Sequence, residues 1–101
     1  MDSRPNLQTF LEKLINSRNV YFDPPASIHM NYDAIRFTRK KIDKLHANNG
    51  VYKLLTPYEL TVISRSPESY IINLLLQLPY CSHDRHYVSD NLHHDVFTLY
   101  Y

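Results

Sequence analysis

The sequence predicts a single α+β domain over residues 1–101, with two helices and a largely antiparallel, curved sheet that ends in a β-hairpin. Two segments repeat apolar residues at the helical spacing, and two others alternate apolar and polar residues as half-buried strands do. Two further alternating runs flank a turn within residues 81–101. Strands and helices do not alternate regularly along the chain, so the pattern favours α+β over a parallel α/β fold. A length of 101 residues suits one domain.

The first predicted element is an amphipathic helix. Asp2 or Ser3 can cap it, and Pro5 is tolerated in its first turn. The polar stretch "NSRN" ends the helix near Ser17. Its apolar residues recur every three or four positions, which predicts one buried stripe. The stripe consists of Leu7, Phe10, Leu11, Leu14 and Ile15.

Extended chain and strands follow this helix. Val20–Pro25 is expected to be extended, because a residue before proline avoids the helical region. In "AIRFT", Ile35 and Phe37 alternate with polar neighbours, as in a half-buried strand. The sequence around Gly50 predicts a turn, with a charged hairpin or loop before it. In "YELTVI", which begins at Tyr58, the same alternation predicts a second strand.

A second helix is predicted to begin with Ser66 as its cap and Pro67 at its first position, and to stop at Pro79. One apolar strip along this helix consists of Ile71, Leu74, Leu75 and Leu78. Ile72 and Leu76 form a second apolar strip, so the helix is too apolar to lie half in water. Either the sheet curls around it or a neighbouring subunit covers it.

The segment "CSHDRHYVSDNLHHDVFTLYY", residues 81–101, predicts a β-hairpin that turns at "SDN". It contains four of the six histidines and the single cysteine. His83 and His86 are three positions apart, so on a regular strand they point to opposite faces, as do the adjacent His93 and His94. Metal ligands from the two strands could converge, for instance His86 with His94 and Asp84, but no spacing requires it. A metal-dependent hydrolase that also uses Asp95 is the enzymatic alternative.

The composition narrows the possible functions. One glycine excludes phosphate-binding loops and the dinucleotide fingerprint. A net charge of +1 gives no general attraction to nucleic acid or anionic membranes, and no apolar run approaches the ~20 residues of a membrane span. Cys81 has no second cysteine to pair with, which fits a reducing compartment, and no signal peptide is expected. Nine tyrosines suit either strands or protein contacts.

Two local patterns have both a structural and a functional interpretation. Cys81 near a histidine could act as a nucleophile, but a lone cysteine after a helix is more often a small buried residue. A basic run could contact DNA phosphates, but the acidic residues Asp33 and Asp43 reduce its net positive charge. A solvated charged face is therefore the structural interpretation. The basic run consists of Arg36, Arg39, Lys40, Lys41 and Lys44.

Three stretches resemble a family of short phage virion proteins. They are "NVYFDPP" at residues 19–25, "YELTVISRSPES" at 58–69 and "DRHYVSDNLHHDVFTLYY" at 84–101. The last is the most specific, with the family pattern D-R-x-Y-x-x-D-N-L-x-H-D-V-F-x-L-Y-Y. The resemblance covers nearly the whole chain. We associate the family with the head–tail neck of tailed phages, as tail terminator (tail-completion) proteins.

The resemblance implies an α+β subunit that forms a hexameric ring, caps the tail tube and joins it to the neck. It implies partners in the tail tube protein, a neck or head-closure protein and further copies of itself, with non-specific contact with DNA in the lumen. It implies a virion protein made in the host cytoplasm, with no membrane partner, no cofactor, no metal and no catalytic residues. A head-closure adaptor on the portal side is the alternative. The expected interface residues are Arg36, Arg39, Lys40, Ile72, Leu76, Arg85, Asp95, Tyr100 and Tyr101.

Overall fold

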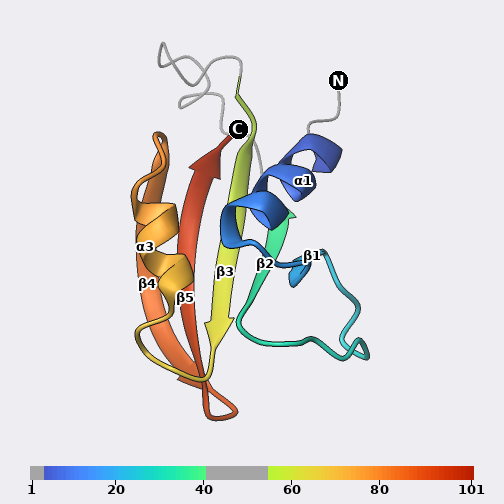
Figure 1. Ribbon diagram of the computed structural model, residues 1–101, viewed down its shortest axis with the longest axis vertical. Coiled ribbons are helices and arrows are strands. Elements are labelled where there is room, and N and C mark those ends of the chain that lie inside the picture. The colour runs from blue at the N-terminus through green and yellow to red at the C-terminus, as the bar shows by residue number, and fades with distance from the viewer. Residues whose placement is uncertain (1–3, 41–54) are drawn as a thin grey trace.

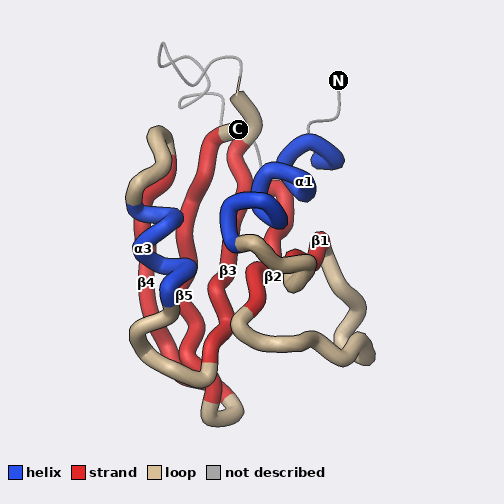
Figure 2. Tube along the Cα trace, viewed as in Figure 1, coloured by secondary structure: helices blue, strands red, loops and turns tan. Residues whose placement is uncertain are grey.

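The computed structural model describes residues 4–40 and 55–101, and these form one sheet with two helices packed on the same face (Figure 1). The predicted α+β class is confirmed. Figure 2 separates the layers by colour, with both helices in front of the strands. In chain order the elements are α1 (Arg4–Ile15), β1 (Val20–Phe22), β2 (Ala34–Arg39), β3 (Pro57–Ser64), α3 (Tyr70–Leu76), β4 (Cys81–Ser89) and β5 (Leu92–Tyr100).

Within the described residues the sheet has five strands in the order β1-β2-β3-β5-β4. Of the pairings among them, β1 with β2 is parallel and the other three are antiparallel, as predicted for most of the sheet. The last strand, β5, lies inside the sheet between β3 and β4. The long β4 is an outer strand, and the three-residue β1 forms the opposite edge.

The helix α1 confirms the predicted amphipathic stripe. Leu7, Leu11 and Ile15 are buried against the sheet. The helix ends at Ile15. The next residue, Asn16, has a positive φ of 54°, and the Ser17 N–H donates to the Glu12 carbonyl in a Schellman-type cap. The predicted end near Ser17 is therefore confirmed.

The strands bury one face against the helices, as their alternation predicts. The prediction that β3 is only half-buried is wrong, because Thr61 and Ile63 on its other face are buried as well. Val62 and Leu60 of β3 lie beside Ile35 and Phe37 of β2, and Phe97 of β5 is fully buried on the same face. These side chains and the apolar faces of α1 and α3 form one core cluster. Burying this apolar surface is the main force that holds both helices on the sheet.

The helix α3 is shorter than predicted. It begins after Ser69, whose backbone is extended and whose hydroxyl accepts a hydrogen bond from the Ile71 N–H. Ser66, the predicted cap, instead accepts from the N–H of Glu68 within the preceding turn, so that prediction is wrong. The Asp33 carboxylate explains the shift: it accepts hydrogen bonds from the hydroxyls of Ser69, at 2.7 Å, and Ser64, at 3.0 Å.

The predicted turn around Gly50, the charged loop before it, and the caps Asp2 and Ser3 lie outside the described residues.

Candidate functional site: the histidine-rich hairpin

The β4–β5 hairpin reverses through two residues, Asp90 and Asn91, which join the paired Ser89 and Leu92. Both have positive φ, 54° and 62°, the geometry of a type I′ turn. Asp and Asn tolerate this left-handed conformation better than most residues. The turn predicted at "SDN" is confirmed, and its geometry fixes which side chains of β4 and β5 share a face.

A β-bulge in β4 changes the arrangement of the histidines. The pairing shifts between His83 and Arg85, so Asp84 is an extra residue in the strand. His83 pairs with Phe97 and His86 pairs with Asp95, and both partners belong to the face that carries the helices. The prediction that His83 and His86 point to opposite faces is therefore wrong, because the bulge adds one residue to the strand.

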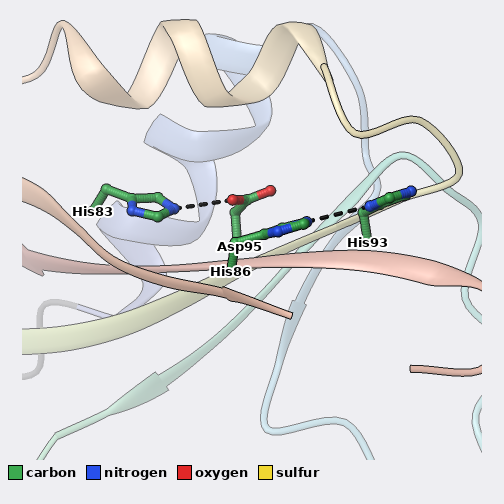
Figure 3. Close-up of polar contacts among 4 residues, drawn as sticks. All are labelled: His83, His86, His93 and Asp95. Atoms are coloured by element: carbon green, nitrogen blue, oxygen red, sulfur yellow. Dashed lines mark hydrogen bonds and ion pairs between the residues drawn. The ribbon is translucent and has the colours of Figure 1, made fainter. Parts of the chain in front are cut away.

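Four polar side chains gather on this helix-bearing face of the hairpin (Figure 3). His83 Nε2 lies 2.9 Å from Asp95 Oδ1, and the His83 ring stands edge-on to Phe97. His86 Nε2 lies 3.2 Å from His93 Nδ1. The planes of these two rings differ by 8° and the rings lie end to end, so the nitrogens point towards each other. Asp95 is buried, so its bond to His83 satisfies a carboxylate that would otherwise be costly to bury.

The proposed convergence of His86 with His94 and Asp84 does not occur. His94 lies on the opposite face of the hairpin, where its ring stacks on Tyr87 at 4.6 Å between centroids. Asp84 accepts a hydrogen bond from the Thr98 hydroxyl, which also accepts one from Lys40 Nζ. Within residues 4–40 and 55–101, no three His, Cys, Asp or Glu side chains come together in a group that could hold a metal ion. The site expected for the metal-dependent hydrolase is therefore divided between two faces.

Cys81 is a poor candidate for a nucleophile. Burial first, and then the negative charge of Asp84, raise the pKa of its thiol from 9.0 to about 11. The thiolate is the reactive form, so this thiol stays largely protonated and unreactive at neutral pH. Its side chain also packs against the core, in line with the structural interpretation.

The described part of the basic run does not form a single patch. Arg36 lies on the face opposite the helices, in a polar hollow of about 240 Å³ that it shares with Asp23 and Glu59. Arg39 is opposite Tyr58, whose side chain belongs to the core face. Lys40 is bonded to Thr98, while Lys41 and Lys44 lie outside the described residues.

The other expected interface residues lie in different environments. Leu76 is 53% exposed on α3, whereas Ile72 is half-buried against the core. Arg85 is exposed opposite the helices, where Nη1 lies 4.0 Å from Glu59 Oε1. Tyr100 is half-buried, and the ring of Tyr101 packs on Phe10 at 5.6 Å between centroids.

An apolar hollow of about 400 Å³ lies near Tyr101. Its lining is mainly apolar and aromatic, and two of the expected interface residues, Tyr100 and Tyr101, belong to it. The residues around it are Phe10, Leu55, Leu78, Pro79, Tyr80, Leu99, Tyr100 and Tyr101.

Comparison with protein families, with curated proteins and with solved structures finds no match to this chain. In the described parts of the chain, neither helix has the length and apolar character needed to cross a membrane.

Proposed function

We propose that this protein is a structural subunit of the phage head–tail junction, a tail terminator that forms a hexameric ring above the tail tube. Its partners would be the tube protein below and a neck protein above. The sequence stretches described above support this proposal, and the most specific of them coincides with β4 and β5. The residues of that stretch have folding roles: Asp90 and Asn91 make the turn, and Asp95 bonds to His83.

The observation that carries the proposal is the exposed flank formed by α3 and β4. Eight of the nine residues of β4 are exposed, the exception being the half-buried Cys81. Val88 of β4 is 57% exposed and Leu76 of α3 is 53% exposed. An outer strand with apolar side chains beside it is a surface suited to contact with another chain.

A closed ring needs two different surfaces on each subunit, because its contacts are head-to-tail. The opposite edge of the sheet supplies the second surface. There β1 is the outer strand, and the connection between β1 and β2 carries Ile28, which is 42% exposed. In Figure 1 this connection and β4 lie at opposite sides of the molecule. The α3–β4 flank of one copy would thus meet the β1 edge of the next copy.

Cryo-electron microscopy of the head–tail junction in purified virions tests the location. The expected result is a sixfold ring of this chain directly above the last ring of the tail tube. Density on the portal side would instead make the protein a head-closure adaptor. Absence from the particle would overturn the structural role altogether.

A substitution tests the surface. Val88→Glu places a charge where the ring contact would form, and every ring repeats that contact at each subunit. We expect a loss of infectious particles of at least a hundredfold in complementation. Lys13→Gln is the matched control, because it lowers the charge by the same amount on the exposed side of α1. Both variants should unfold at the wild-type temperature, since both positions are exposed. Normal particle yield from Val88→Glu would contradict the proposed contact.

A further inference from the structure

We propose that His86 and His93 form a two-histidine binding site for a divalent metal ion of the Zn²⁺ type, which joins β4 to β5. The ring nitrogens His86 Nε2 and His93 Nδ1 lie 3.2 Å apart and point towards each other in nearly parallel rings (Figure 3). A contact between two ring nitrogens needs one hydrogen between them. A metal ion that replaces this proton would be bound by both lone pairs.

The separation of the two nitrogens suits this exchange. Zn²⁺ binds imidazole nitrogen at about 2.0–2.1 Å, and tetrahedral geometry then places two such nitrogens about 3.3 Å apart. The observed 3.2 Å is close to that value, and the ion would lie beside the line that joins the two nitrogens, so each ring must turn by roughly 35° for its lone pair to meet the ion. His86 is opposite Asp95 and His93 is opposite Val88, which makes the two histidines diagonal neighbours on one face. Long side chains reach each other across such a diagonal.

The surroundings favour a cation. The carboxylate of Asp95 lies on the same face, directly across from His86. Neither Lys nor Arg occurs on this face of β4 and β5 or in α3, three elements that the structure describes completely. Arg85, the one basic residue of the hairpin, lies on the opposite face beside Glu59. From these three elements a bound cation would therefore meet a carboxylate and no Lys or Arg side chain.

The site differs in kind from a catalytic metal centre. Two protein ligands leave the remaining coordination positions to water, and the exposed His86 allows water to reach them. We expect reversible binding in the micromolar range, with one ion per chain. The ion would connect the exposed outer strand β4 to β5, the inner strand next to it. This inference is independent of the proposed function.

A titration of ZnCl₂ into the full chain tests the proposal. Binding is monitored by calorimetry and by ¹⁵N NMR of the imidazole rings. The ring nitrogens of His86 and His93 should shift together and saturate at one equivalent. His94, whose Nδ1 lies 3.0 Å from the carbonyl of Leu92 on the other face, should not shift.

Variants identify the ligands. His93→Gln retains a hydrogen-bonding side chain and removes the imidazole, so zinc should bind at least tenfold more weakly. His29→Gln, a change at an exposed histidine outside the hairpin, should leave the affinity unchanged. Lack of saturable binding by the wild-type chain would overturn the proposal, as would equal affinity in His93→Gln. The ring shifts of the wild-type chain decide the question even if a variant does not fold.

Discussion

The carboxylate of Asp33 connects three parts of the fold, and its removal should destabilise the whole domain. Asp33 accepts hydrogen bonds from Ser64 at the end of β3 and from Ser69, the N-cap of α3. Its backbone carbonyl also accepts a bond from the side chain of Asn19, which precedes β1. We predict that Asp33→Ala lowers the free energy of unfolding, because it leaves two serine hydroxyls without their acceptor.

The magnitude follows from the burial of these hydroxyls. Ser64 and Ser69 are 2% and 3% exposed, so water cannot readily replace the carboxylate. Hydrogen bonds to a charged group contribute about 1.5–3 kcal/mol each. Asp33 is only half-buried, which favours the lower end of that range and gives a loss of about 3 kcal/mol for the pair. For a domain of this size, that loss lowers the midpoint of thermal unfolding by about 12–24 °C.

Urea unfolding followed by circular dichroism measures the loss directly. Glu68→Ala is the matched control, because it removes an exposed carboxylate next to the same helix and should cost less than about 0.5 kcal/mol. A double-mutant cycle with Ser69→Ala should give a coupling energy above about 0.5 kcal/mol. A loss below about 1 kcal/mol for Asp33→Ala, or strict additivity with Ser69→Ala, would refute the reasoning.

Two further predictions concern the hairpin. Asn91→Val places a β-branched residue at a φ of 62°, so it should lower the free energy of unfolding, measured with urea, by about 1–2 kcal/mol. Asn91→Gly should not lower it. Equal stability of the two variants would argue against the turn geometry. Alkylation of Cys81 by iodoacetamide should keep accelerating as the pH rises from 9.0 to about 11, because its pKa is raised, and a plateau near pH 9.0 would contradict this. The raised pKa also means that the stabilisation from the protonated thiol is complete below pH 9.0 and is lost as the pH rises through about 11.

Most of the fold follows from side-chain periodicity. The stripe from Leu7 to Ile15 and the alternation in β2, β3 and β5 each identify a buried face without any tertiary information. The start of α3 could not be obtained in this way. Ser66 and Ser69 are both acceptable caps by residue type, and Asp33, distant in sequence, selects Ser69 through a hydrogen bond. Caps that depend on a tertiary contact are not visible in local sequence.

The arrangement of the hairpin histidines was only partly predictable. A two-residue turn at Asp90 and Asn91 pairs Val88 with His93, and this places His86 on the face of His93. That inference was available from the turn alone. The contact of His83 with Asp95 could not be predicted, because it depends on the bulge at Asp84. No residue type in this segment indicates a bulge of this kind. Strict alternation counted back from Tyr87 therefore breaks at Asp84, and the residues before it are assigned to the wrong face.

The position of β5 in the sheet has a consequence for the folding pathway. Its partners on β3 are distant in sequence, from Ser64 paired with His93 to Pro57 paired with Tyr100, whereas its partners on β4 are joined to it by a two-residue turn. Local pairings form fast and distant ones slowly, since loop closure costs entropy. The β4–β5 hairpin is therefore expected to form early and to dock on β3 as a unit. Until it docks, Phe97 and Leu99 remain exposed to water, so the transition state for folding should contain the hairpin and the first contacts of Phe97 with Leu60.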